Sequence, residues 1–203
     1  MEALAVVWKN APVVFVLLLL IATVSTAIFL EKLVSVKKSK VLPRGWRQIK
    51  LYLAAGNYEA AIAALKRDGR PLARALANLL ELYHRGEISK LELVQLVEAE
   101  GNLLYYELTK KTSFLSASVT LATLVGLIGT VWGLIKVFAA YSSMGAEGIR
   151  LLAEGIATSL NSTAAGLLVA VYGYLLYWLV RERINGVYSK VLRELEEFVE
   201  LIK

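Results

Sequence analysis

Hydroxyl-bearing side chains recur along one face of each of two uncharged segments. If residues 112–135 are helical, Ser113, Ser116, Thr120, Thr123 and Thr130 fall within a sector of about 100°. In residues 155–180 a sector of about 80° holds small or hydroxylated residues, namely Gly155, Ser159, Thr163, Gly166, Ala170 and Gly173. Such hydroxyls can hydrogen-bond water or a carboxyl group, or they can bond a carbonyl in their own helix. The two faces therefore indicate either a polar path or close helix packing.

Two further features of these segments bear on that choice. Asn161 adds an amide, and an unpaired polar group costs several kcal/mol in lipid, so it needs a polar or hydrated neighbour. No side chain in either segment titrates near neutral pH. A proton crossing here would need an acid from another protein. Close packing is the competing interpretation, because Gly129 and Gly133 have the spacing at which membrane helices approach one another.

The elements that carry these residues are predicted to cross a membrane. The chain has 203 residues, 57% of them apolar, and residues 10–30, 112–135 and 155–180 contain no Asp, Glu, Lys or Arg. A helix needs about 20 apolar residues to span a bilayer. We expect an all-α membrane protein with three transmembrane helices, not a soluble domain. Cysteine is absent and His84 is the only histidine, so we expect no disulfide, metal site or cofactor.

The distribution of basic residues predicts the orientation. Residues 31–111 hold 15 Lys and Arg against 9 Asp and Glu, and a run without acids follows the first span: Lys37, Lys38, Lys40, Arg44, Arg47 and Lys50. Short segments rich in Lys and Arg stay in the cytoplasm, where they also face anionic lipid. This predicts the N-terminus outside and the C-terminus inside, and it favours a membrane over nucleic acid as the partner of the basic residues. A cleaved signal peptide is the weaker alternative, since its apolar region is normally shorter.

These observations divide the chain into six predicted parts: a first span (1–30), a helical cytoplasmic domain (31–111), a second span (112–135), an external connection (136–154), a third span (155–180) and a cytoplasmic C-terminal helix (181–203). In the domain, turns are expected at Gly56-Asn57 and between Gly69 and Pro71. From the cap at Ser89, one helix is expected to continue into the second span.

An apolar seam runs along the C-terminal helix at heptad spacing: Ile184, Tyr188, Val191, Leu195, Phe198 and Ile202. The seam predicts packing either on the chain's own cytoplasmic domain or on sister copies.

Two motifs resemble those of the MotA/TolQ/ExbB proton-channel family. Residues 125–133, Val-Gly-Leu-Ile-Gly-Thr-Val-Trp-Gly, are similar to its Gly-Leu-x-Gly-Thr-Val-Trp-Gly signature, and residues 155–167 are similar to its third-span segment. The resemblance covers about residues 112 to 181, and three spans place it nearer the TolQ/ExbB branch than the flagellar stator branch.

The resemblance implies a mechanism and partners. Members of the family form a pentamer around a dimer of a single-span ExbD- or TolR-like protein, whose membrane aspartate carries the proton; a TonB- or TolA-like protein is a further implied partner. The implied location is the inner membrane. Thr130 and Thr163 would be pore hydroxyls facing that aspartate. With Ser159, Asn161, Ser162 and Thr123 they form the predicted pore lining, while Gly126, Gly129, Gly133, Gly166 and Gly173 are predicted to pack helices.

The chain also departs from the family pattern. Thr158 replaces an acid, although Glu154 lies one turn earlier; Tyr172 and Thr123 replace prolines; Asn161 and Ser162 replace small apolar residues. Protons are expected over sodium, since the spans lack an acid for a sodium site. The alternatives to a channel subunit are a flagellar-type stator subunit and a non-conducting scaffold. An enzyme is not expected, because no catalytic motif appears in the spans.

Overall fold

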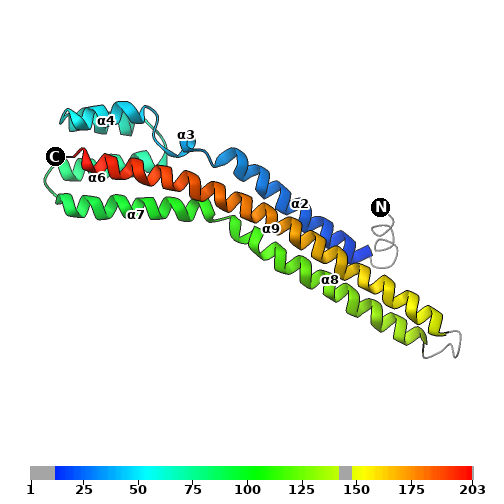
Figure 1. Ribbon diagram of the computed structural model, residues 1–203. Coiled ribbons are helices and arrows are strands. Elements are labelled where there is room, and N and C mark those ends of the chain that lie inside the picture. Colours follow the sequence, from blue (N-terminus) through cyan, green and yellow to red (C-terminus); the bar gives the residue numbers. More distant parts are fainter. Residues whose placement is uncertain (1–11, 142–147, 203) are drawn as a thin grey trace. The chain divides into compact units, whose positions relative to one another are not determined.

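The computed structural model describes residues 12–141 and 148–202, and these residues form helices without any strand (Figure 1). The helices are α2 (Pro12–Ser35), α3 (Lys38–Val41), α4 (Trp46–Ala54), α5 (Tyr58–Lys66), α6 (Pro71–His84), α7 (Lys90–Thr109), α8 (Thr112–Tyr141) and α9 (Gly148–Glu200). Three stretches are long and apolar enough to cross a membrane: Val13–Ser35, Lys90–Ala139 and Leu152–Glu200. The expected all-helical protein with three candidate spans is confirmed. Residues 1–11 of the predicted first span and 142–147 of the predicted connection lie outside the described residues.

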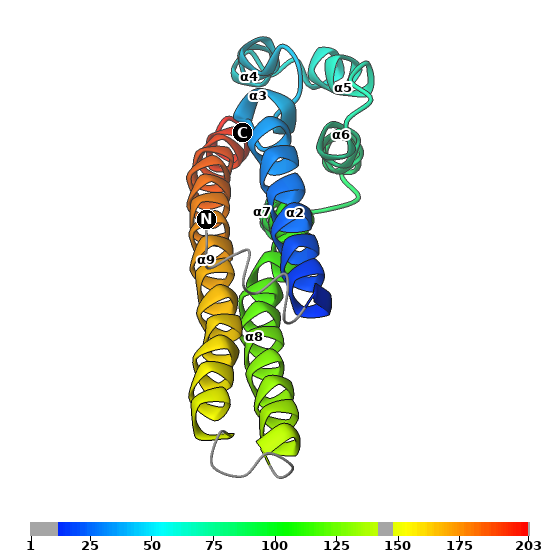
Figure 2. The same cartoon turned by 90° about the vertical axis from the view of Figure 1, so that its right-hand side faces the viewer.

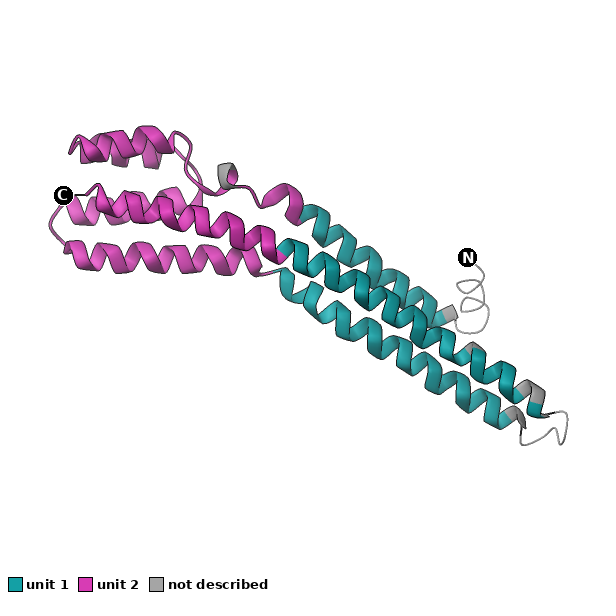
Figure 3. Ribbon diagram, in the orientation of Figure 1, with its two compact units in different colours: residues 1–31, 111–180 teal, residues 32–110, 181–203 magenta. Residues whose placement is uncertain are grey.

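The chain divides into two compact units (Figure 3). Unit 1 comprises residues 1–31 and 111–180, and unit 2 comprises residues 32–110 and 181–203. Two helices belong to both units. α2 changes from unit 1 to unit 2 after Glu31, and α9 does so after Val180.

Unit 1 is a bundle of the first part of α2, α8 and the first part of α9, which lie side by side in both views (Figures 1 and 2). Its buried centre is made of small and branched side chains: Val14, Leu18, Ala122 and Ala170, with Val125, Ala165 and others partly buried against them. Large apolar side chains point outward instead, such as Leu168 at 70% exposed and Ile128 at 62%. This distribution is the reverse of a soluble domain and suits helices surrounded by lipid.

Unit 2 has a conventional apolar core beneath a charged surface. Ile49, Leu53, Leu65, Leu76 and Leu80 are fully buried in it. The expected turns are confirmed: α4 ends before Gly56, which has φ 71°, and α6 begins at Pro71. Asn57 caps α5 by accepting a hydrogen bond from the Ala60 N–H at 3.0 Å.

The predicted start of the next helix is also confirmed. Ser89 forms a capping box with Glu92 at the start of α7: its side chain accepts from the Glu92 N–H, and its own N–H donates to the Glu92 carboxylate at 2.7 Å.

One sequence expectation is wrong: the helix that begins after Ser89 does not continue unbroken into the second span. It ends at Thr109, and α8 begins at Thr112 after a turn at Lys110 and Lys111. Other donors reach the carbonyls of the last turn of α7. Lys32 Nζ donates to the Leu108 carbonyl at 2.6 Å, and the Thr109 hydroxyl donates to that of Tyr105 at 2.9 Å. These donors satisfy a helix end where the sequence holds no proline or glycine to announce it.

The helices around the predicted external connection are longer than the sequence suggested. The described part of α8 extends to Tyr141 and α9 starts at Gly148, so both ends of residues 136–154 are helical. The charged residues used to place that connection, such as Lys136 and Glu154, are exposed on helices, which tolerate them without a break.

Candidate functional site

The hydroxyls of Thr130 and Thr163 meet between α8 and α9 and hydrogen-bond each other. The Thr130 hydroxyl also lies 3.1 Å from the carbonyl of Ser159, and the Thr163 hydroxyl lies 3.4 Å from that of Gly126. Thr130 is 8% exposed, whereas Thr163 is only half-buried. The two residues predicted to act together therefore form one site in unit 1, with an edge open to the surface at Thr163.

The hydrogen-bonding capacity of this pair is not used up. Two hydroxyls carry two protons and four acceptor lone pairs. One proton can serve the bond between the hydroxyls and the other a backbone carbonyl, which leaves acceptor positions free. A third group approaching at the open edge can donate to the pair when it is protonated, and when it is ionised it can accept from the hydroxyl that gives up its bond to the backbone carbonyl. These are the two states of a carboxyl group that carries a proton.

Glycines create the close approach that brings the two threonines together. A Cβ atom at Gly126 would lie 2.8 Å from the Gly166 Cα, and a Cβ atom at Gly166 would lie 2.7 Å from the Ala122 carbonyl oxygen. A Cβ at Gly129 would lie 2.8 Å from the Cβ of Ser162. The backbones of α8 and α9 are therefore in direct contact at Gly126 and Gly166, next to the threonine pair, and Gly129 packs against the Ser162 side chain.

The other two predicted packing glycines lie along the same contact. A Cβ at Gly133 would overlap Ser159, and one at Gly173 would lie 3.2 Å from the hydroxyl oxygen of Ser118. All five glycines thus lie along the contact between α8 and α9.

The remaining predicted pore-lining residues are placed differently from the pair. Ser159 is 4% exposed and donates to the Gly155 carbonyl at 2.9 Å, and Ser162 is 2% exposed against Gly129. Thr123 is half-buried and donates to the Val119 carbonyl at 3.1 Å. Asn161 is half-buried but lies two residues from Thr163, a turn of about 200° around α9. Of the six, only Thr130 and Thr163 join their hydroxyls across the two helices.

Another polar contact in unit 1 joins α2 to α9. The Tyr172 phenol and the Thr26 hydroxyl lie 2.8 Å apart, and Thr26 also donates to its own Ala22 carbonyl at 2.7 Å. The sequence showed Tyr172 only as the replacement of a proline. Its bond to a residue 146 positions away carries no local pattern, so no sequence signal would have revealed it. Glu154 is exposed, and the side chain of Thr158 lies outside the described part of the chain.

The seam of the C-terminal helix is buried within unit 2. Ile184, Val191, Phe198 and Ile202 are fully buried, Leu195 is 2% exposed, and the core that encloses most of them contains side chains of α4 to α7. Tyr188 is half-buried, and burial raises the pKa of its phenol, with the charges of Glu98 and the Tyr105 phenol adding to the rise. The side chains used for this packing are thus occupied within the chain itself.

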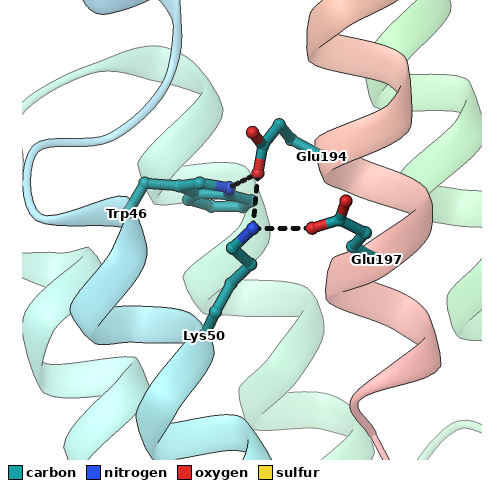
Figure 4. A network of polar contacts seen from close by, with 4 residues as sticks. All are labelled: Trp46, Lys50, Glu194 and Glu197. Carbon is teal, nitrogen blue, oxygen red and sulfur yellow. Dashed lines mark hydrogen bonds and ion pairs between the residues drawn. The ribbon is translucent and has the colours of Figure 1, made fainter.

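Ion pairs and hydrogen bonds fasten α4 to the last turns of α9 (Figure 4). Lys50 Nζ lies 2.8 Å from a Glu194 oxygen and 2.6 Å from a Glu197 oxygen, and the Trp46 indole N–H donates to Glu194 at 2.8 Å. The hydrogen bonds to Glu194 and then Glu197 raise the pKa of Lys50 above its usual value. The Trp46 ring also stacks on Phe198 with centroids 5.6 Å apart.

A basic side chain also bonds the carbonyls at the end of α2. Arg183 on α9 donates to the carbonyl of Val36 at 3.2 Å and to that of Leu33 at 3.1 Å. Positive charge at a helix C-terminus is favourable. Among the described residues there is no group of three or more His, Cys, Asp or Glu side chains that could hold a metal ion.

The fold and the site define a class: a helical, multi-pass membrane protein with a hydroxyl pair between two closely packed, uncharged helix segments. Residues 67–192, more than half of the chain, match the MotA/TolQ/ExbB proton channel family. The chain belongs to this family, which confirms the resemblance of its two span motifs.

Individual relatives place the chain on the TolQ/ExbB branch. It is 30% identical over 95 residues to the Tol-Pal system protein TolQ of Haemophilus influenzae, covering 47% of this chain and 42% of that protein. It is 30% identical over 136 residues to the biopolymer transport protein ExbB of Pseudomonas putida, covering 66% and 40%. The ExbB of Aquifex aeolicus is 36% identical over 77 residues, covering 37% and 52%. The matches thus span about half or less of the length of these relatives.

Proposed function

We propose that this chain is the proton-channel subunit of an ion-driven motor in the inner membrane. Several copies, five by analogy with the family, surround a dimer of a single-span ExbD- or TolR-like protein. The acid of that partner carries the proton past the Thr130–Thr163 pair. A TonB- or TolA-like protein receives the resulting motion.

The observation that carries the proposal is the cross-helix hydroxyl pair in spans that contain no charged residue. The spans supply hydrogen-bond acceptors and donors next to each other, yet residues 112–135 and 155–180 contain no carboxyl group and no histidine. Such a site stabilises a carboxyl group in either protonation state, but it cannot itself take up and release a proton near neutral pH. A companion acid completes it.

The driving force follows from the membrane potential. One elementary charge crossing 100 mV releases about 2.3 kcal/mol, so repeated proton passages supply work that can be done elsewhere. The Lys and Arg excess in residues 31–111 supports an outside N-terminus and an inside C-terminus. In this orientation unit 2 lies in the cytoplasm.

The test is proton flux into liposomes that contain this chain and the ExbD- or TolR-like single-span protein encoded in the same genome, whose membrane aspartate supplies the acid. Thr130→Val and Thr163→Val keep the side-chain shape but remove the hydroxyl. We expect each to lower the flux about tenfold or more, equivalent to about 1.4 kcal/mol in the barrier. Thr130→Ser should retain most of the flux.

The matched control is Thr26→Val, which removes a hydroxyl of α2 that bonds Tyr172 and Ala22 instead. Its flux should stay close to that of the wild type. Unchanged flux in both Thr130→Val and Thr163→Val, with the complex intact, would show that the pair is not on the ion path and would favour a non-conducting scaffold.

A further inference from the structure

Several polar side chains of unit 1 have no hydrogen-bond partner in the described part of the chain; they include the buried Ser25 hydroxyl, an amide on α9 and an indole on α8. Asn161 on α9 is half-buried, and Trp132 on α8 is 62% exposed. The described residues supply no hydrogen bond to the Asn161 amide or to the Trp132 indole. Both belong to segments predicted to lie in the membrane, where an unpaired amide is costly. Something outside the chain is therefore expected to meet them.

The two side chains lie at the same depth in the bundle. Thr130 contacts Ser159, and Gly129 faces Ser162, which fixes how α8 and α9 are aligned. Trp132 is two residues beyond Thr130, and Asn161 lies between Ser159 and Ser162 in the sequence. At 1.5 Å per residue, each is within about 3 Å of this contact along its helix.

Neither side chain points toward the threonine pair. Trp132 follows Thr130 by two residues, and Asn161 precedes Thr163 by two. Two residues turn a helix by about 200°, which puts each polar group about 160° around its helix from the neighbouring threonine. Because each threonine points toward the other helix, Trp132 points away from α9 and Asn161 points away from α8, so the two polar groups lie on opposite sides of the α8–α9 pair.

The surroundings of Asn161 suit another helix. Ala157 and Ala164, four residues before and three residues after it, are exposed. Small side chains on either side of a polar one let a second helix come close enough to hydrogen-bond. Around Trp132 the exposed residues are branched and apolar instead, such as Ile128 at 62% and Ile135 at 58%.

We propose that Asn161 of one copy accepts a hydrogen bond from the Trp132 indole N–H of the neighbouring copy. The indole only donates and the amide oxygen only accepts, so the two unpaired groups are complementary. They are on different helices, so the contact joins unlike surfaces of two copies, and repetition about an axis along the membrane normal keeps the depth equal and closes a ring. The inference rests on the proposed assembly of several copies and adds the contact that joins them.

The chain has no cysteine, so a disulfide test has no background. Trp132→Cys and Asn161→Cys chains carrying different tags are co-expressed, purified in mild detergent and oxidised. We expect a disulfide-linked dimer that carries both tags. Neither variant expressed alone should form that dimer, and a chain with both substitutions should form a ladder of linked copies. The matched control pairs Trp132→Cys with Leu168→Cys, another exposed position of α9 about 10 Å farther along the helix; it should give no dimer.

Several outcomes would overturn the proposal. If native mass spectrometry shows an intact oligomer but the mixed pair gives no dimer, the copies assemble through other contacts, and the proposed function stands while this contact does not. A double variant that links only within one chain has the same meaning. A dimer from one variant alone would show that like surfaces meet.

A second measurement does not depend on cysteine variants. Trp132→Phe keeps the ring but removes the N–H, and Asn161→Ala removes the amide. Each should lower the detergent concentration at which the oligomer dissociates, and the double variant should be no weaker than the weaker single variant, because both remove the same bond. Additive losses would contradict the contact and would fit an indole that bonds lipid head groups instead.

Discussion

Gly126 and Gly166 touch through their backbones: a Cβ on Gly126 would lie 2.8 Å from the Gly166 Cα, and one on Gly166 would lie 2.7 Å from the Gly126 Cα. No side chain fits between the two helices at this point. The contact lies next to the Thr130–Thr163 pair, since the Thr163 hydroxyl is 3.4 Å from the Gly126 carbonyl oxygen. Packing and polar site are therefore two aspects of one arrangement, and a change in one is expected to disturb the other.

Gly166→Ala should separate α8 from α9 and destabilise unit 1. Overpacking of a tight contact costs about 1–3 kcal/mol, so we expect a lower melting temperature in detergent. Gly186→Ala is the control in the same helix, because a Cβ there meets nothing within 4 Å. Alanine should stabilise that position by up to about 1 kcal/mol. Equal melting temperatures for Gly166→Ala and the wild type would contradict the close backbone contact.

Lys50→Met tests the attachment of α4 to α9. The substitution removes both ion pairs but leaves the Trp46 bond to Glu194. We expect a loss of about 1 kcal/mol in the free energy of unfolding, at the upper end for ion pairs that are partly exposed. Lys66→Met, which breaks the more exposed pair with Glu81, should lose less.

The ion pairs of Lys50 also predict that the free energy of unfolding changes at alkaline pH. Because the pKa of Lys50 is raised in the folded protein, its contribution is complete below the usual lysine value and is lost as the pH rises through the folded value. The stability difference between wild type and Lys50→Met should therefore shrink above about pH 10.5. A difference that stays constant into strong alkali would show that the charge of Lys50 does not stabilise the fold.

The Asp68 carboxyl group predicts how the stability of unit 2 changes at acidic pH. Burial raises the pKa of this carboxyl group, but the backbone N–H groups of Arg44 and Arg70, together with the two arginine charges, outweigh it and lower the pKa overall. The stabilisation is therefore present above the usual aspartate value and is lost as the pH falls through the lower, folded value. Asp68→Asn should cost about 1.5–3 kcal/mol near neutral pH, the range for hydrogen bonds to a charged group.

The measurement is chemical denaturation of both proteins from pH 7 to pH 2. The difference between wild type and Asp68→Asn should be constant at neutral pH and should shrink only below about pH 4. A difference that disappears already at pH 5 or 6 would mean that the carboxyl group is not held ionised by its neighbours.

How much of this arrangement the sequence predicts depends on how local each cause is. The three candidate spans follow from uninterrupted apolar runs, and the caps at Asn57 and Ser89 follow from side chains that bond within three residues. The end of α7 at Thr109 could not be predicted in this way. The Lys32 side chain that bonds the Leu108 carbonyl in its last turn is 76 residues away in the sequence. A helix end can be predicted from the sequence only where the group that satisfies its free backbone atoms lies within a few residues.

The candidate site was likewise predictable only in part from the sequence. Helical spacing was sufficient to put hydroxyls on one face of each of the two helices, but not to say which of them meet. Thr130 and Thr163 form a bond while Ser159 turns back to its own helix, because glycines at 126 and 166 set how far apart the helices are and in what register they lie. The seam left two alternatives from the sequence, and the burial of Phe198 and Ile202 shows packing within the chain.

The central claim is that this chain provides the hydroxyls of a proton path and a companion provides the acid. The most direct measurement compares proton flux in three liposome preparations: the chain alone, the chain with its single-span companion, and the chain with a companion whose membrane aspartate is changed to asparagine. Flux only in the second preparation is the predicted result. Flux of equal size through the chain alone, with no companion acid present, would contradict the account.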